Sequence, residues 1–169
     1  MSDKSKEVVI VGAVRTPIGK YNGSLKKMKA HELGSIVINE VLKRSKIKPN
    51  EIDEVIMGQV LTAGAGQNPA RQAAVNAGIP ISKPAYMVNQ VCGSGLRAVI
   101  AGYQSIKLGE LKKVICGGQE TMSIAPHSIF FREKEIISVD RLNDKIMDDG
   151  LIDAFNNYNM VVTAEKVAK

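Results

Sequence analysis

Cys92 lies between a strand-like segment and a helix-like segment, a position in which a thiol can become a nucleophile. Residues 85–90 are mostly apolar and are predicted to form a strand, and residues 96–108 are predicted to form a helix. The unpaired N–H groups and the positive dipole end at a helix start favour the thiolate over the thiol. Gly93 and Gly95 keep the intervening turn open, so a carbonyl could approach closely and its oxyanion could meet backbone donors. Cys92 is therefore the candidate catalytic nucleophile.

The alternative for Cys92 is an inert thiol, buried as a small residue in a glycine-rich turn, as is common for unpaired cysteines. Asn89 and Ser94 add polar groups near that turn. Cys116 has the weaker case for chemistry, because it ends a predicted strand before two glycines and no helix begins beside it. We predict that Cys116 is an inert core thiol.

The elements that must position Cys92 alternate between strands and helices along the chain. Strands are predicted over residues 7–13, 54–61, 85–90 and 112–116, and helices over 30–44, from Pro69 to near Gly78, and over 96–108. Asn68 is the expected N-cap of the second helix, because Pro69 fits its first position. Apolar residues on most faces of the third helix predict that it is buried. The alternation predicts an α/β fold, a mostly parallel sheet with right-handed crossovers and helices on both faces.

The pattern changes after residue 121. Residues 123–149 are mixed and charged, without a sustained period, and we interpret them as an excursion from the sheet that precedes a helix near the end. We divide the chain into an α/β part over residues 1–121 and a second segment over 122–169. Helix-like sequence continues to Lys169 with no Gly or Pro stop signal, so we expect a truncated chain.

The composition indicates a soluble globular protein. The 169 residues are 44% hydrophobic, which is enough for a packed core. A charged N-terminus and the absence of an apolar run near the ~20 residues of a membrane span favour the cytoplasm. Two cysteines without paired spacing predict free thiols and no metal site. The net charge of +6 comes from scattered lysines with few aromatic residues between them, which disfavours nucleic acid and suits an anionic, phosphorylated small molecule.

Residues 89–98 read NQVCGSGLRA and closely resemble the active-site signature of the thiolase family. Three more segments resemble parts of that family in the same order: VGAVRTPIG at 11–19, GGQETMS at 117–123 and GLIDAF at 150–155. The resemblance covers nearly the whole chain, whereas the chain covers less than half of a thiolase subunit. Gln90, Val91 and Gly93 resemble the biosynthetic acetyl-CoA acetyltransferases more than the degradative enzymes, which favours short acyl groups.

The resemblance implies a fold, a reaction and a substrate. The fold would be the N-terminal half of an α-β-α-β-α layered structure, its last strand missing, with the start of a loop domain. The complete fold packs two halves around buried helices, so one half alone would expose the helix over residues 96–108. Cys92 would take the acyl group from one acyl-CoA and pass it to the α-carbon of a second, condensing two acetyl-CoA to acetoacetyl-CoA or the reverse. Leu151, Asn159 and Met160 would line the CoA and acyl pocket. The CoA thioester is the substrate, no further cofactor is implied, and the complete enzyme would be a homodimer or homotetramer.

Several parts of the family's site are missing from this sequence. The resemblance puts an activating histidine, an oxyanion asparagine and a second cysteine in the absent C-terminal half, so we expect no turnover from this chain alone. His31 and His127 are predicted to be surface or structural histidines and not replacements. Asn159 stands where the biosynthetic pattern has histidine, and Val161 where it has glycine; Asn can hydrogen-bond but cannot titrate near neutral pH.

Two alternatives stay open. The chain could be a truncated, non-catalytic protein that only pairs with another thiolase-like subunit, which Asn159 and Val161 favour. Finding no Gly-His-Pro and Cys-x-Gly motifs encoded downstream would support that alternative over the enzyme. The chain could also be another condensing enzyme, such as a ketoacyl synthase acting on an acyl-carrier protein, although residues 89–98 argue against it.

Overall fold

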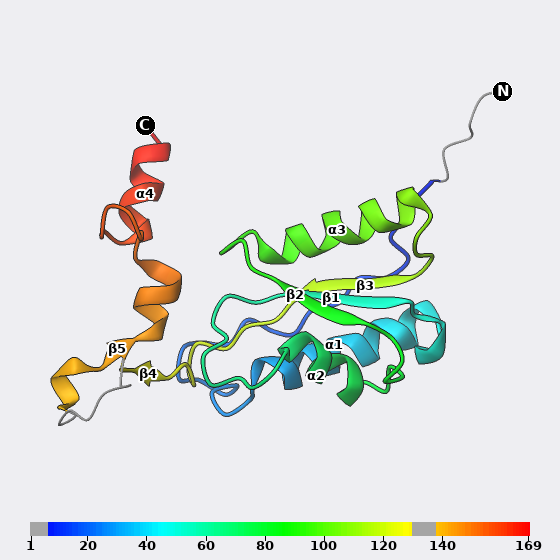
Figure 1. The fold of residues 1–169 in the computed structure, drawn as a ribbon, viewed down its shortest axis with the longest axis horizontal. Helices are drawn as coiled ribbons and strands as arrows, with labels where there is room; N and C mark the ends of the chain where they lie inside the picture. Colours follow the sequence, from blue (N-terminus) through cyan, green and yellow to red (C-terminus); the bar gives the residue numbers. More distant parts are fainter. Residues whose placement is uncertain (1–6, 130–137) are drawn as a thin grey trace.

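A three-stranded parallel sheet is the centre of the computed structural model, which describes residues 7–129 and 138–169 (Figure 1). The middle strand, β1 (Glu54–Gly58), pairs with β2 (Ala85–Val88) on one side and with β3 (Val114–Gly118) on the other. All three strands run in the same direction, so their carboxyl ends lie at one edge of the sheet. The α/β class predicted from the sequence is confirmed.

Helices cover both faces of this sheet. Figure 1 shows α1 (Ala30–Ser45) and α2 (Pro69–Asn76) on one face and α3 (Ser94–Leu108) on the other. Because helices lie on both sides, Val55 and Ile56 of β1 have no exposed surface. The main core lies between β1 and the α1–α2 layer and is formed by Ile38, Leu42, Ile52, Val55, Met57, Ala70, Ala73, Ala74, Ala77 and Ile79.

The helix boundaries follow from local capping. The carboxylate of Glu32 accepts a hydrogen bond from the N–H of Lys29 at 2.7 Å, which satisfies a donor at the start of α1. Lys46 ends this helix in the left-handed conformation, with φ of 56°. The predicted cap of α2 is confirmed, because the side chain of Asn68 accepts a hydrogen bond from the N–H of Arg71 at 3.1 Å.

The first turn of α3 lies directly on the ends of β1 and β3. A Cβ atom added at Gly58 would lie 2.5 Å from the carbonyl carbon of Ser94 and 2.6 Å from the nitrogen of Gly95. A Cβ atom at Gly118 would lie 3.4 Å from the Cα of Gly95. Glycine at these strand ends therefore lets the helix backbone approach the sheet backbone.

The helix α3 is not buried within the described chain, and its exposure agrees with what is expected of one half of the layered fold. Its inner face packs on the sheet through Ser94, Ala98 and Gly102, but Leu96 is 68% exposed and Leu108 is 75% exposed. Apolar residues on both faces predict burial on both sides, yet in the described residues the sheet covers only one side.

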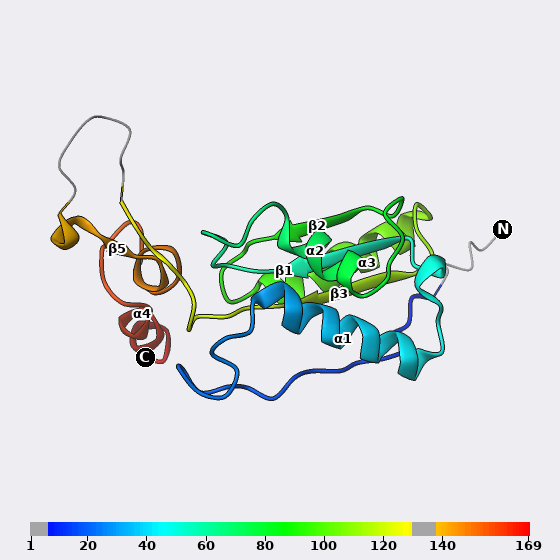
Figure 2. The same ribbon diagram turned by 90° about the horizontal axis from the view of Figure 1, so that it is seen from below.

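The predicted strand over residues 7–13 is wrong, because these residues are extended but form no strand. Figure 2 shows this N-terminal segment, in dark blue, running beside α1 on the β3 side of the sheet. Val9 is 62% exposed and Val11 is 65% exposed. A strand needs a partner for its backbone groups, and no strand of the described residues lies against this segment.

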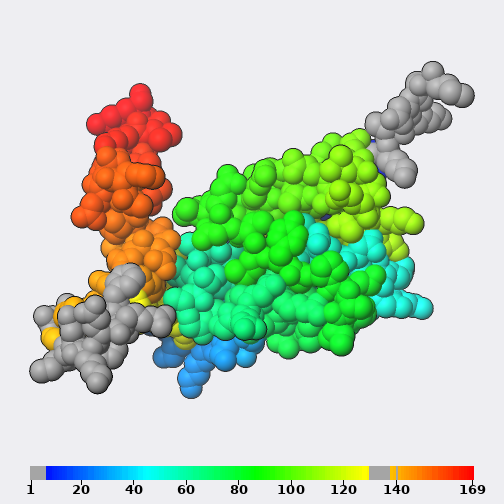
Figure 3. All heavy atoms as spheres, in the orientation of Figure 1, coloured from blue at the N-terminus to red at the C-terminus, as the bar shows by residue number. Residues whose placement is uncertain are grey.

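The C-terminal segment forms a separate column beside the start of α3 (Figures 1 and 3). It contains the antiparallel pair β4 (His127–Ser128) and β5 (Asn143–Asp144) and the helix α4 (Met160–Val167), which confirms the predicted C-terminal helix. Residues 130–137 of the predicted excursion lie outside the described residues. Short 3₁₀ helices occur at Pro49–Glu51 and Val139–Arg141, and a π-helical turn at Met147–Leu151. Within residues 7–129 and 138–169, no helix has the length and apolarity needed to cross a membrane.

Replacing Gly58 by alanine should destabilise the chain by about 3 kcal/mol, because the new methyl group would overlap the first turn of α3. Gly117→Ala is the matched control, since a Cβ atom there would lie 3.6 Å from the sulfur of Met57, an ordinary contact. The control should change the free energy of unfolding by less than about 1 kcal/mol. Urea unfolding measures both values, and equal effects would contradict the close approach of α3.

Candidate active site

Cys92 lies in the turn that joins β2 to α3, at the edge of the sheet where the strands end. It is solvent-exposed and unpaired. Gly93 is the N-cap of α3, so the thiol-bearing residue directly precedes a helix of 15 residues. The structure thus gives Cys92 the position predicted from the sequence, beside the positive end of a helix dipole. The alternative of a buried Cys92 is inconsistent with its exposure, whereas its reactivity stays a prediction.

The turn around Cys92 is closed by backbone hydrogen bonds. The N–H of Gly93 donates to the carbonyl of Gln90 at 3.1 Å, and the N–H of Ser94 donates to the carbonyl of Val91 at 3.1 Å. Val91 has a positive φ of 49°, which is unusual for a β-branched residue. Cys92 therefore follows directly after a sharp reversal of the backbone.

Two polar side chains, predicted only to lie near Cys92, hold this same turn. The carbonyl oxygen of the Asn89 side chain accepts a hydrogen bond from the N–H of Val91 at 2.9 Å. The Ser94 hydroxyl accepts a hydrogen bond from the N–H of Gln90 at 2.8 Å and donates to the carbonyl of Val91 at 2.6 Å. Both side chains are bonded to the turn backbone.

Cys116 has a different environment, as the sequence predicts. It lies in β3 with its sulfur against Gly102 of α3, and it is partly buried. Burial raises the pKa of the Cys116 thiol to about 11, because the apolar surroundings disfavour the thiolate. This thiol is protonated at neutral pH and packs between sheet and helix.

The loops that follow β1 and β3 are tied together near the same edge of the sheet. The Glu120 carboxylate accepts hydrogen bonds from the N–H of Val60 at 2.8 Å and from the N–H of Leu61 at 3.3 Å. Burial raises the pKa of Glu120, and the N–H donors of Val60 and Leu61 act in the opposite direction. The buried Gln119 side chain also donates to the side chain of Gln59 at 2.9 Å.

Gln119 and Glu120 were not predicted as site residues, although they lie in the family-like segment 117–123. The available signal was two polar residues shortly after a predicted strand, because the carboxyl ends of parallel strands meet at one edge. Their hydrogen bonds, buried for Gln119 and part-buried for Glu120, link loops that are about 60 residues apart in the chain, a pairing that no local pattern reports.

Leu151, Asn159 and Met160 all lie in the C-terminal segment. Leu151 ends the π-helical turn, Met160 begins α4, and Asn159 is the N-cap of α4. A backbone bridge between Ile152 and Asn159 brings these three residues into one region. The side chain of Asn159 accepts a hydrogen bond from the N–H of Val161 at 3.0 Å. The role of these residues in CoA binding stays a prediction.

The two histidines lie on other elements than the Cys92 turn. His31 is on α1, with its Nδ1 atom 3.4 Å from the side-chain nitrogen of Asn76 on α2. His127 is in β4, where its backbone lies opposite Asp144 of β5. That neither histidine activates Cys92 stays a prediction.

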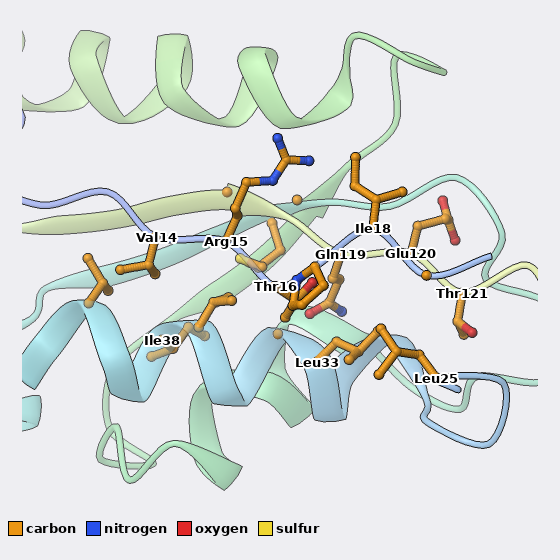
Figure 4. A pocket seen from close by; sticks show the side chains of 18 of the residues that line it. Val14, Arg15, Thr16, Ile18, Leu25, Leu33, Ile38, Gln119, Glu120 and Thr121 are labelled. Carbon is orange, nitrogen blue, oxygen red and sulfur yellow. The ribbon is translucent and has the colours of Figure 1, made fainter. Parts of the chain in front are cut away.

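A separate cavity of about 630 Å³ lies along the free edge of β3. It is lined on one side by Gly117 and Gly118, on the other by the N-terminal segment around Val14 and Thr16, and below by α1. Figure 4 shows Leu33 and Ile38 of α1 at this cavity and Arg15 pointing away from α1, toward the face that carries α3. The cavity separates the N-terminal segment from the edge of β3.

Comparisons with known proteins agree on one family. Residues 8–169 match the family described as thiolase, N-terminal domain. A cytosolic acetyl-CoA acetyltransferase of Mus musculus is 53% identical over 169 residues, which is 100% of this chain and 43% of that protein. An acetyl-CoA acetyltransferase of Cupriavidus necator is 52% identical over 164 residues, which is 96% of this chain and 42% of that protein.

A solved structure shares the fold. The crystal structure of Acat5 thiolase from Ascaris suum in complex with coenzyme A matches with a TM-score of 0.89 and 38% sequence identity. The match covers 96% of this chain and 42% of that chain. The chain spans less than half the length of the relatives that it matches.

The two cysteines should differ strongly in their reaction with iodoacetamide. At pH 8 a thiol with a pKa of about 11, as in Cys116, is about 0.1% thiolate, whereas Cys92 is exposed in an open turn. Peptide mapping by mass spectrometry should find Cys92 fully modified before Cys116 is detectable. Because the Cys116 pKa is raised, its labelling rate should grow nearly tenfold for each pH unit between 8 and 10. Equal labelling of both thiols at pH 8 would contradict this assignment.

Proposed function

Because this chain belongs to the thiolase family, we propose that it carries the nucleophile of an acetyl-CoA C-acetyltransferase. The reaction is the condensation of two acetyl-CoA molecules to acetoacetyl-CoA, or its reverse, through an acyl-enzyme on Cys92. The observation that carries the proposal is the exposed thiol at the start of α3, at the edge where the parallel strands end. The names of the relatives from Mus musculus and Cupriavidus necator support the substrate.

The chemistry begins with the thiolate of Cys92. It attacks the thioester carbonyl of the first acetyl-CoA, and the carbonyl electrons move to an oxyanion that backbone N–H groups can stabilise. When the carbonyl re-forms, the C–S bond to CoA breaks and the CoA thiolate leaves, taking up a proton. The α-carbon of a second acetyl-CoA, after losing a proton to a base, then attacks the Cys92 thioester and releases the cysteine thiolate. The CoA thioester is the substrate in both steps, and the proposal needs no further cofactor.

We propose that the described residues of this chain supply no base for the second step, the deprotonation of the α-carbon. His31 and His127 lie on α1 and β4, and neither belongs to the turn that holds Cys92. The resemblance assigns the activating histidine, the oxyanion asparagine and the second cysteine to the C-terminal half of the family. We therefore propose that turnover requires that half, and that residues 1–121 and 122–169 are the α/β part and the beginning of a loop domain.

Two unfilled surfaces support the need for a C-terminal half. The outer face of α3 exposes Leu96, Ile100, Tyr103 and Leu108, a row of apolar side chains that solvent does not favour. The face fits a second layer of helix or sheet packed on α3. We propose that the C-terminal half covers it.

The second unfilled surface is the edge of β3. In the described residues β3 pairs only with β1, and the cavity separates its free edge from the extended residues 7–13. We propose that the missing last strand of the sheet enters this space. That strand would give backbone partners to β3 and to the N-terminal segment, which would explain why an apolar, extended segment forms no strand here.

The non-catalytic alternative keeps one specific observation in its favour. The side chain of Asn159 caps α4 by accepting the N–H of Val161, so it serves a structural bond at a position where the family pattern has a titrating histidine. In this alternative the chain pairs with another subunit without turnover. For the complete protein we propose a cytoplasmic homodimer or homotetramer, and the outer edge of β2, unpaired within the described residues, is available for such a contact.

Acetyl-CoA should transfer one acetyl group to this chain at Cys92. Incubation followed by intact-mass measurement should show an acetyl adduct in the wild type and in the control Cys116→Ser, but not in Cys92→Ser. A Cys92→Ser protein that is acetylated to the same extent would refute the nucleophile. Absence of any adduct from the wild type would favour the non-catalytic alternative.

Supplying the missing half should restore turnover. We expect that this chain, coexpressed with the C-terminal part of the Cupriavidus necator relative, cleaves acetoacetyl-CoA in the presence of CoA, and that Cys92→Ser abolishes the activity. The chain without its partner should show none, because neither histidine of the described residues lies in the Cys92 turn and the family's activating histidine belongs to the C-terminal half. Turnover by the separate chain, or none from a stable complex, would contradict the proposed division of the site.

A further inference from the structure

We propose that the Ser94 hydroxyl is a positioning group that holds Val91 in its left-handed backbone conformation and thereby aims Cys92. The inference rests on the function proposed for Cys92, because it concerns how that thiol is placed. It assigns Ser94 no contact with substrate.

Val91 needs such support, because its conformation is unfavourable. Its φ is 49°, and the branched Cβ of valine crowds the backbone in that region. The other described non-glycine residues with positive φ are three asparagines and a lysine, namely Asn22, Asn68, Asn157 and Lys46. Asparagine tolerates this region, and Lys46 ends a helix. Val91 is therefore the strained member of the set, and it directly precedes the nucleophile.

The Ser94 side chain bonds to the backbone on both sides of the strained residue. Its oxygen accepts the N–H of Gln90 at 2.8 Å, and its hydroxyl donates to the carbonyl of Val91 at 2.6 Å. Asn89 adds a third bond, to the N–H of Val91 at 2.9 Å. The chain can satisfy these bonds together only while the backbone reverses at Val91.

Ser94 is itself fixed by the sheet. It is 4% exposed, so water does not compete well for its hydroxyl. A Cβ atom at Gly58 would lie only 2.7 Å from the Cβ of Ser94, so Ser94 can occupy this place only because residue 58 of β1 is glycine. Strain at Val91 is thus opposed by a side chain anchored to β1, the most buried strand.

Loss of the hydroxyl should release Val91. With negative φ at Val91 the chain enters Cys92 in another direction, and the thiol no longer lies at the start of α3. The charge-stabilising N–H groups of the helix would then be out of reach of the sulfur. The expected effect is a slower reaction of Cys92, separate from any change in CoA binding.

A double-mutant cycle on the full 169-residue chain tests this coupling. The readout is the rate constant for alkylation of Cys92 by iodoacetamide at fixed pH, measured for the wild type, Ser94→Ala, Val91→Gly and the double variant. Ser94→Ala should lower the rate about tenfold, equivalent to ~1.4 kcal/mol. In the Val91→Gly background the same change should cost less than about twofold, because glycine adopts positive φ without strain. Ser105→Ala, a serine change further along α3, is the matched control and should leave the rate unchanged.

Equal losses from Ser94→Ala in both backgrounds, or no loss in either, would overturn the proposal. Cys116 labelling at pH 8 in the same samples reports unfolding, because in the folded chain only about 0.1% of that thiol is thiolate. If Ser94→Ala unfolds the chain, the double variant should be folded again; a double variant that is also unfolded overturns the proposal. The assay uses no acyl-CoA, so a failed acetylation of Cys92 would refute the proposed function and leave this coupling intact.

Discussion

The close approach of α3 to the end of β1 is the contact on which the rest of the candidate site depends. Gly58 has no side chain, and the backbone of Ser94 and Gly95 occupies the space that a methyl group would need. The helix therefore begins directly above the strand end, and the chain must reverse sharply between β2 and α3 to get there. Cys92 lies in that reversal, so a packing constraint between two backbones decides where the thiol is placed.

The same constraint gives the residues around Cys92 different environments. Ser94 is buried against β1 and bonds to the turn, while Cys92, two residues earlier, stays open to solvent. Cys116 packs beneath α3 at Gly102, on the inner face of the helix, and is protonated at neutral pH because burial raises its pKa. Two thiols on neighbouring elements thus have opposite roles, one exposed at a helix start and one packed beneath the helix.

The described part of the chain carries apolar surface that it does not bury itself. α3 has an outer face of leucine, isoleucine and tyrosine, and the edge of β3 opens onto a cavity lined by the N-terminal segment. An α/β layer normally hides both kinds of surface, since apolar area in water and unpaired strand edges are unfavourable. Both unfilled surfaces fit a chain that spans less than half the length of its relatives.

The sequence by itself determined the class of the fold and the family and predicted Cys92 as the nucleophile, because each of these depends on local pattern. Apolar runs, the Asn68 cap and the ten residues around Cys92 can be recognised in the sequence without knowing which elements pack against them in the fold. Tertiary structure alone decided that residues 7–13 form no strand, because a strand depends on partners distant in sequence. It also decided the strain at Val91 and the bonds of Ser94, which arise where β2 and α3 meet β1, and the bonds of Glu120, which arise where the loops after β1 and β3 meet.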